Sequence, residues 1–159
     1  PDLLAALREA QAHIGCAVVQ IALSDDQIIA DHMREADKIM RAAINFDNDT
    51  IKAVIVSDAY TFSSAHEFLT DLGTVVGTAQ TLTTKSTTGG VFDADDLDFG
   101  AIAPGPVCKA VVFYKDTGSA ATSPLIEYAD EVTGFPMTAN GGGITVPISN
   151  GAYKIISLV

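Results

Sequence analysis

The sequence predicts an α+β protein in which an N-terminal helical segment, residues 1–45, precedes an antiparallel β-sandwich over residues 46–159. The chain has 159 residues, which fits about one domain. Its first 44 residues contain one glycine and no proline after Pro1, whereas the rest contains twelve glycines and five prolines. A helical apolar period also gives way, near residue 45, to short apolar runs separated by turn residues.

A helix is predicted from about residue 25 to residue 44. Ser24 and Gln27 have the spacing at which two side chains reciprocally cap a helix start. An apolar face with a helical period follows. It consists of Ile28, Ile29, His32, Met33, Ala36, Ile39, Met40 and Ala43. Upstream, a second helical stripe runs from Leu3 to Ile14, and the apolar run 16–23 fits either a buried strand or a continued helix.

Two runs, residues 51–57 and 107–115, are apolar at both odd and even positions. Strands with this pattern are buried on both faces, so we expect both runs at the centre of a sheet.

Shorter elements are expected around these two strands. Residues 64–67 resemble a capping box that opens a short helix ending at Leu72. Residues 81–94 read as a hairpin whose turn uses Gly89 and Gly90. Further strands are predicted at 125–130, 144–149 and 153–159, and Pro147 indicates an edge position for the second of them. Six to eight short strands without strand–helix alternation favour a β-sandwich.

The charge balance argues against two classes of partner. Lysine and arginine number 9 against 20 aspartates and glutamates, which gives a net charge of −11, and no arginine follows Arg41. Phosphate recognition depends on basic side chains, so we expect no nucleic-acid partner. No uninterrupted apolar stretch approaches the roughly 20 residues of a membrane-spanning helix, so no membrane association is expected either.

Neither the cysteines nor the histidines form a metal-binding motif. Cys16 and Cys108 lie in apolar runs, too far apart in the sequence for a CxxC pair. We expect both to be reduced and buried, in a protein of cytoplasmic origin whose first residues lack the features of a secretion signal. His13, His32 and His66 are scattered. The sequence therefore predicts no metal site and no cofactor.

One string, Asp116-Thr117-Gly118-Ser119, matches the catalytic loop of aspartic proteases, in which two carboxylates share a proton. Lys115 occupies the position before the aspartate, and no second such loop is present, so a protease would have to be a homodimer. An ordinary turn at the end of a strand is the alternative that we favour.

The acidic run 93–98 suggests a calcium site, because hard cations bind carboxylate oxygens. The spacing does not fit an EF-hand loop, since Leu97 stands where a ligand is needed and Asp98 where a glycine is needed. We therefore expect a solvated turn instead.

A set of strings in residues 46–159 resembles, in its order, a small family encoded in tailed-bacteriophage genomes. The strings are DTIKAVIV (49–56), HEFL (66–69), GVFDADD (90–96), VFYKDTG (112–118), SPLI (123–126), GFP (134–136) and NGG (140–142). The related proteins are virion structural proteins of the head and neck region. The resemblance implies no catalytic residues, and it does not extend to residues 1–45.

This resemblance implies a capsid decoration or cement protein, a structural protein and not an enzyme. Its partner would be the major capsid protein, and it would form a homo-oligomer, with a trimer as the first guess. It would be located on the capsid surface of the virion after assembly in the bacterial cytoplasm.

Two alternatives remain open. One is a neck or tail component such as an adaptor, terminator or tube subunit. The other is a glycan- or receptor-binding β-sandwich, which would favour exposed aromatic side chains. Tryptophan is absent, and the four tyrosines mostly occupy predicted strand positions; they are Tyr60, Tyr114, Tyr128 and Tyr153.

Overall fold

The structure is a computed structural model that describes residues 44–151 and 154–157. The predicted helices of the N-terminal segment fall on residues 1–43 and so lie outside the described residues. From Ile44 the chain enters a turn in which the Asp49 amide donates a hydrogen bond to the Asn45 carbonyl at 2.7 Å. The rest is mostly antiparallel β-sheet, as the sequence predicts for this region.

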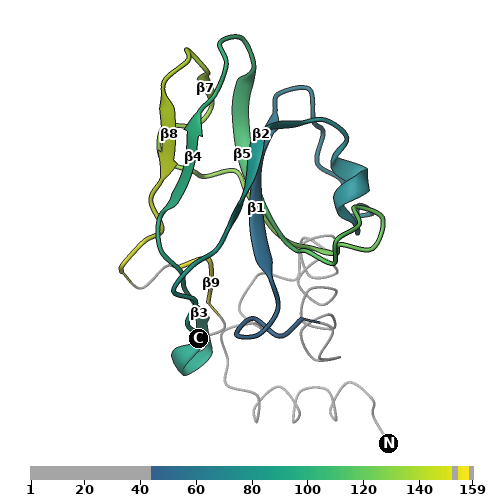
Figure 1. Ribbon diagram of the computed structural model, residues 1–159, viewed down its shortest axis with the longest axis vertical. Coiled ribbons are helices and arrows are strands. Elements are labelled where there is room, and N and C mark those ends of the chain that lie inside the picture. The colour runs from purple at the N-terminus through teal and green to yellow at the C-terminus, as the bar shows by residue number, and fades with distance from the viewer. Residues whose placement is uncertain (1–43, 152–153, 158–159) are drawn as a thin grey trace, which may run out of the picture.

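The main sheet is curled and contains five antiparallel strands (Figure 1). Its order is β2–β1–β5–β6. The fifth strand, β7, pairs with the first two residues of β5, whereas β6 pairs with the second half of β5. The strands are β1 (Ile51–Ser57), β2 (Val75–Thr81), β5 (Val107–Lys115), β6 (Leu125–Ala129) and β7 (Met137–Thr138). The predicted central strands 51–57 and 107–115 are β1 and β5, and their bounds are confirmed.

Two further strand pairs complete the described β-structure. Strand β4 (Leu97–Ala101) pairs with β8 (Gly143–Val146), and β3 (Val91–Phe92) pairs with β9 (Ile156–Ser157). The sheet curls until β2 approaches the chain just after β4. There Gly77 has a φ of +72°, which strains any residue with a side chain, and a Cβ at this position would lie 3.1 Å from Ile102 Cδ1, which would have to shift.

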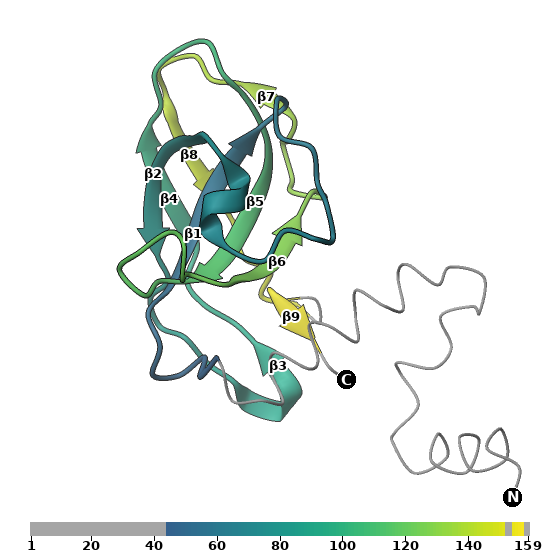
Figure 2. The ribbon, with the colours of Figure 1, turned by 90° about the vertical axis from the view of Figure 1, so that its right-hand side faces the viewer.

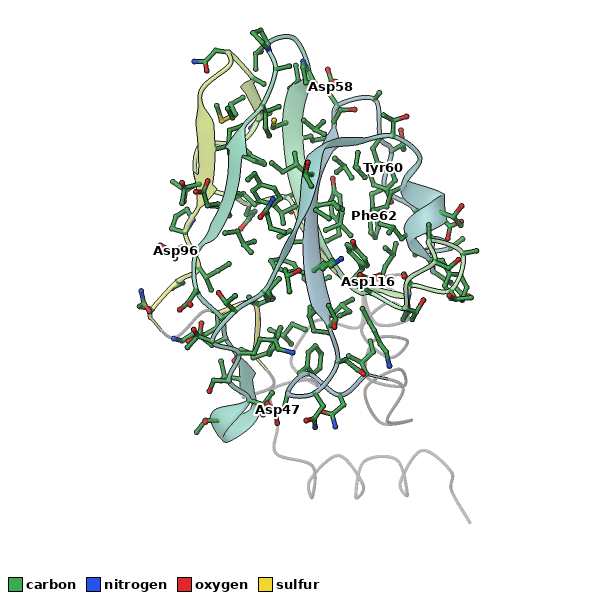
Figure 3. All side chains as sticks on the ribbon, viewed as in Figure 1. Asp47, Asp58, Tyr60, Phe62, Asp96 and Asp116 are labelled. Atoms are coloured by element: carbon green, nitrogen blue, oxygen red, sulfur yellow. The ribbon has the colours of Figure 1, made fainter. Side chains whose placement is uncertain are left out.

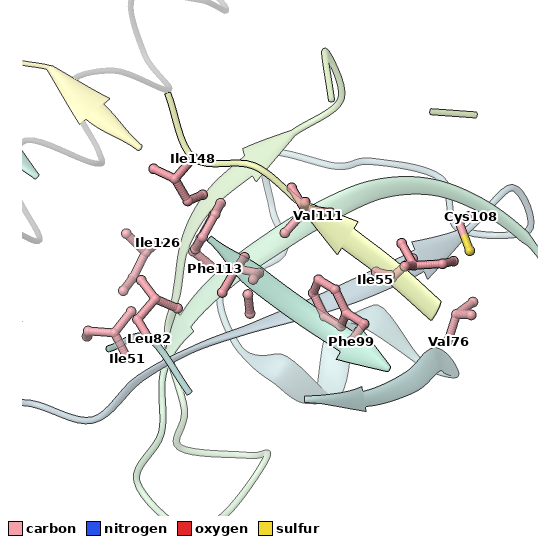
Figure 4. Packing of buried hydrophobic residues seen from close by; sticks show 14 of the residues in the cluster. Ile51, Ile55, Val76, Leu82, Phe99, Cys108, Val111, Phe113, Ile126 and Ile148 are labelled. Carbon is pink, nitrogen blue, oxygen red and sulfur yellow. The ribbon is translucent and has the colours of Figure 1, made fainter. Parts of the chain in front are cut away.

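The inner face of the main sheet packs against the β4–β8 pair (Figure 4). Alternate residues of each strand enter this core, as expected for a pleated strand with one face inward. The core is entirely apolar and includes Ile51, Ile55, Val76, Leu97, Phe99, Cys108, Val111, Phe113, Ile144 and Val146.

The outer face of the same sheet is covered by the segment that connects β1 to β2 (Figure 2). This segment includes the short 3-10 helix η1 (Leu69–Leu72), whose Leu72 is buried against the sheet. Tyr60 from the start of the segment packs into the same cluster. The remaining buried members come from the sheet; they are Val54, Val56, Ala110, Val112, Tyr114 and Leu125. Both faces of β1 and β5 are therefore buried.

Several predicted details need correction. The hairpin at 81–94 is reduced to one bridge between Ser86 and Asp93, because β3 pairs with β9 and the 3-10 turn η2 (Thr88–Gly90) fills the loop. Gly89 and Gly90 do have positive φ angles, as predicted for this turn. Pro147 follows β8 and does not lie within it, because the strand ends at Val146.

The helix predicted after residues 64–67 begins later and is capped differently. Its first residue is Leu69, and the Asp71 carboxylate accepts the amides of Glu67 and Phe68, both at 2.9 Å. The capping carboxylate is therefore that of Asp71, within the helix, and not that of Glu67, which the capping-box pattern predicts.

Candidate functional site

Asp116 lies in the turn that follows β5, and its carboxylate forms an ion pair with the Lys52 ammonium group. The Gly118 amide donates a second hydrogen bond to this carboxylate at 2.9 Å. The bond from Lys52 and then the bond from Gly118 lower the pKa of Asp116 below its usual 3.8. A carboxylate held in its ionised form by a lysine is poorly suited to share a proton with a second carboxylate. The string forms a strand-end turn, as we favoured.

Hydrogen bonds from the buried Ser123, which is 1% exposed, hold this turn in place. Its hydroxyl donates to the Ser119 carbonyl at 2.8 Å and accepts the Thr117 amide at 3.1 Å. The hydroxyl groups of Thr117 and Thr122 are 2.6 Å apart in the same loop. These bonds pair polar groups of Thr117, Ser119, Thr122 and Ser123 with one another within the loop, which is a structural role.

The four carboxylates of the acidic run 93–98 interact with different partners. One pairs with a lysine, one accepts two threonine hydroxyls, and two accept backbone amides. The pairs are Asp93 with Lys154, Asp95 with Thr83 and Thr84, Asp96 with Ile148, and Asp98 with Gly100. Within residues 44–151 and 154–157, no group of three His, Cys, Asp or Glu side chains could hold a metal ion. Asp95, Asp96 and Asp98 are exposed, as predicted for a solvated run, and Asp93 and Asp96 also join this run to segments that are distant in the sequence.

Cys108 is fully buried in the inner core with a free thiol, as predicted, and burial raises the pKa of this thiol. Cys16, His13 and His32 belong to residues that the structure does not describe. His66 is the one histidine among the described residues, and it contacts Tyr60 in a group of aromatic rings on the surface.

Four rings gather on the outer side of the main sheet, and we call Tyr60, Phe62, His66 and Tyr128 the aromatic patch. The first three come from the segment between β1 and η1, and Tyr128 comes from β6. Figure 3 shows Tyr60 and Phe62 on the η1 side of β1. Phe62 is 49% exposed and is the only exposed large hydrophobic side chain in the described part of the chain.

The rings support one another. The Phe62 and Tyr128 centroids are 4.9 Å apart with planes tilted by 39°, and the Tyr60 and Tyr128 centroids are 6.0 Å apart. The Tyr60 hydroxyl lies 2.8 Å from His66 Nδ1, and the Lys109 ammonium donates to the Tyr60 carbonyl at 3.1 Å. Such tilted ring pairs are favourable. Phe62 therefore packs on Tyr128, and Tyr128 is itself held by its contact with Tyr60.

Carboxylates act electrostatically on the patch. Burial, then the charges of Tyr128 and Asp71, raise the pKa of Tyr60 above its usual 10.0. Burial, then the charge of Asp130, raises the pKa of Tyr128. The Asp71 pKa is lowered by the amides of Phe68 and Glu67, so this carboxylate stays negative. At neutral pH the patch consists of neutral phenols close to negative charges.

Sequence reasoning missed this patch. The tyrosine positions and the absence of tryptophan predict few stacking surfaces, and Phe62 is indeed the only exposed large hydrophobic side chain in the described residues, but its contact with Tyr128 was not predicted. The sequence feature that could have indicated the patch is the pair Tyr60 and Phe62, which follows a buried strand at a position where the core of the sheet does not require aromatic side chains.

Comparison with known proteins gives no family: no family model matches the chain, and no curated protein matches it. None of the helices in the described ranges has the length and apolar character needed to cross a membrane.

Proposed function

We propose that this chain is a structural protein of a tailed-bacteriophage virion. Specifically, it is a decoration or cement protein that binds the outer capsid surface through non-covalent contacts with the major capsid protein. In this role it acts by adhesion and has neither a catalytic site nor a cofactor.

The observation that supports this proposal most strongly is where the phage-like strings lie in the fold. Four of the seven strings come from distant parts of the chain and bond to one another in pairs. The Leu69 amide donates to the Ser123 carbonyl at 2.9 Å, and the Leu125 amide to the Glu67 carbonyl at 2.8 Å, which joins 66–69 to 123–126. The Lys52–Asp116 ion pair joins 49–56 to 112–118. The strings that carry the resemblance thus include residues that bond to one another within the β-structure, which supports reading them as one set.

The fold and charge suit this role. The curled sheet and the β4–β8 pair would form the two layers of a β-sandwich, a rigid platform with a packed interior. The net charge of −11 would keep free subunits apart before assembly. Assembly into a small cyclic oligomer, with a trimer as the first expectation, would let one unit bridge neighbouring capsid subunits.

The amount of this protein per purified particle tests the proposal. Quantitative gel densitometry of gradient-purified virions of the encoding phage should give a copy number comparable to that of the major capsid protein. A copy number equal to a single ring would place the chain in the neck or tail instead. Absence from purified virions would contradict the proposal altogether.

A second measurement tests adhesion directly. The purified protein should sediment with preformed capsids that lack it, and such capsids should become more resistant to heat once it is bound. Failure of the wild-type protein to bind these capsids would contradict a decoration role.

A further inference from the structure

The aromatic patch has the properties of an interface centre. Contacts between proteins depend on a few residues, and aromatic side chains and arginine are enriched among them. Phe62 exposes about half of its surface while resting on Tyr128, which in turn contacts the buried Tyr60. A side chain held in this way loses little conformational freedom on binding, because its base is already ordered.

The surrounding charge selects the kind of partner. The Asp71 carboxylate accepts the amides of Glu67 and Phe68, the two residues after His66, and the exposed Asp130 follows Tyr128 by two residues. The chain after residue 44 has five basic and thirteen acidic side chains, a net charge of −8. The Lys109 ammonium group already donates to the Tyr60 carbonyl. An aromatic surface next to carboxylates attracts a guanidinium or ammonium group through both the ring faces and the negative field.

We propose that the aromatic patch is the surface on which this chain binds a basic segment of the major capsid protein, with an arginine or lysine side chain stacked on Phe62 and Tyr128. This inference rests on the proposed function and adds to it the contact surface and the chemistry of the partner.

Two other occupants fit the patch less well. A second copy of the chain, docked patch to patch, would bring the Asp71 and Asp130 carboxylates of both copies together. A glycan would need hydrogen-bonding groups around the rings, but the Tyr60 hydroxyl already bonds His66, and one Asp71 oxygen already accepts two amides. A basic protein segment uses the ring faces and the net charge instead.

The first experiment varies the ring alone. Binding of wild-type protein and of three variants to capsids lacking this protein is measured by co-sedimentation. Phe62→Tyr keeps the ring and should bind like the wild type. Phe62→Leu keeps apolar area without the ring and should bind several-fold more weakly, and Phe62→Ala about tenfold more weakly. Thermal unfolding of each variant verifies that it is folded.

The second experiment varies the charge with a matched control. Asp130→Asn and Asp98→Asn change the net charge equally, but Asp98 lies on β4, which packs against the inner face of the sheet, opposite to the patch. Asp130→Asn should weaken capsid binding several-fold, and Asp98→Asn should leave it within a factor of about two. Raising the salt concentration from 50 to 500 mM, roughly a threefold reduction of the screening length, should weaken the wild type more than Asp130→Asn.

The outcomes separate the two proposals. If the wild type binds capsids and Phe62→Ala binds equally well, the patch is not the contact surface, while the decoration role stands. If the wild type does not bind capsids, the proposed function itself fails, and this inference with it. Binding of the wild type to host surface polysaccharide that is lost in Phe62→Ala would assign the patch to a glycan and overturn the inference.

Discussion

The two faces of the main sheet are buried by different means. The inner face meets the β4–β8 strand pair, and every buried member of that core is apolar. The outer face meets the segment between β1 and β2, whose short helix and loop bring Tyr60 and His66 with their hydrogen bond. Where the sheet packs against the β4–β8 pair, the buried side chains are apolar. Where the β1–β2 segment covers the sheet, polar groups and aromatic rings lie at the edge of the contact.

This difference predicts that stability and the proposed binding depend on different residues of the same sheet. Residues that point inward from β5, such as Phe113, have no access to a partner. Residues at the margin of the outer cover, such as Phe62, are only half buried and are accessible from solvent. Substitutions on the two faces should therefore have effects of different size and kind.

The largest effect is expected at the centre of the inner face. Phe113→Ala removes a side chain that is 3% exposed and leaves a cavity between the sheet and the β4–β8 pair. It should lower the free energy of unfolding by about 3–5 kcal/mol, measured by urea denaturation. A loss below about 1 kcal/mol would show that the two layers are not packed as described.

A smaller loss is expected under the outer cover. Leu72→Ala removes the buried side chain of η1. It should cost about 2 kcal/mol, at the low end for such a change, because a short helix between loops can settle into the space. A cost greater than that of Phe113→Ala would reverse the comparison between the faces. The same urea titration measures it.

The ion pair at the end of the outer face should matter only over a defined pH range. The pKa of Asp116 is lowered from 3.8 and that of Lys52 is raised from 10.5, in each case first by the hydrogen bond between them. The stabilisation is therefore present between these values. It is lost as pH falls through the lowered Asp116 pKa, or rises through the raised Lys52 pKa.

Asp116→Asn should accordingly cost about 1 kcal/mol or less at pH 7, because the pair is partly exposed and the Asn oxygen can still accept the Gly118 amide. The difference in melting temperature between this variant and the wild type should shrink as the pH is lowered below 4. A difference that stays constant down to pH 2 would assign the cost to turn geometry.

The smallest effect on stability is expected at the patch. Phe62→Ala makes the same chemical change as Phe113→Ala, but at an exposed ring. It should change the free energy of unfolding by about 0.5 kcal/mol or less. A loss comparable to that at Phe113 would mean that Phe62 is part of the packed structure, and its exposure would then not indicate binding.

Some elements could be predicted from the sequence because their signal is local. The runs 51–57 and 107–115 have apolar residues at both odd and even positions, a pattern typical of a strand that is buried on both faces. Gly89 and Gly90 marked a turn with positive φ. By contrast, β4 was hidden because the preceding aspartates looked like a turn, and only Leu97 and Phe99 showed its alternation.

The candidate site was hidden for a related reason. Phe62 and Tyr128 are 66 positions apart, and nothing in either local pattern shows that their rings meet at 4.9 Å. Likewise, the carboxylates of Asp93 and Asp96 bond residues 61 and 52 positions away, and the local pattern of an exposed acidic run does not show these links.

The amino-acid pattern alone determined that residues after 45 form antiparallel strands, that two of them are central, and that Cys108 is buried, because local burial and turn geometry fix these properties. The tertiary structure decided which strands pair, which segment covers the outer face, and where aromatic rings and carboxylates gather. Those features depend on contacts between distant residues, and the energy of such contacts leaves no periodic trace in the sequence.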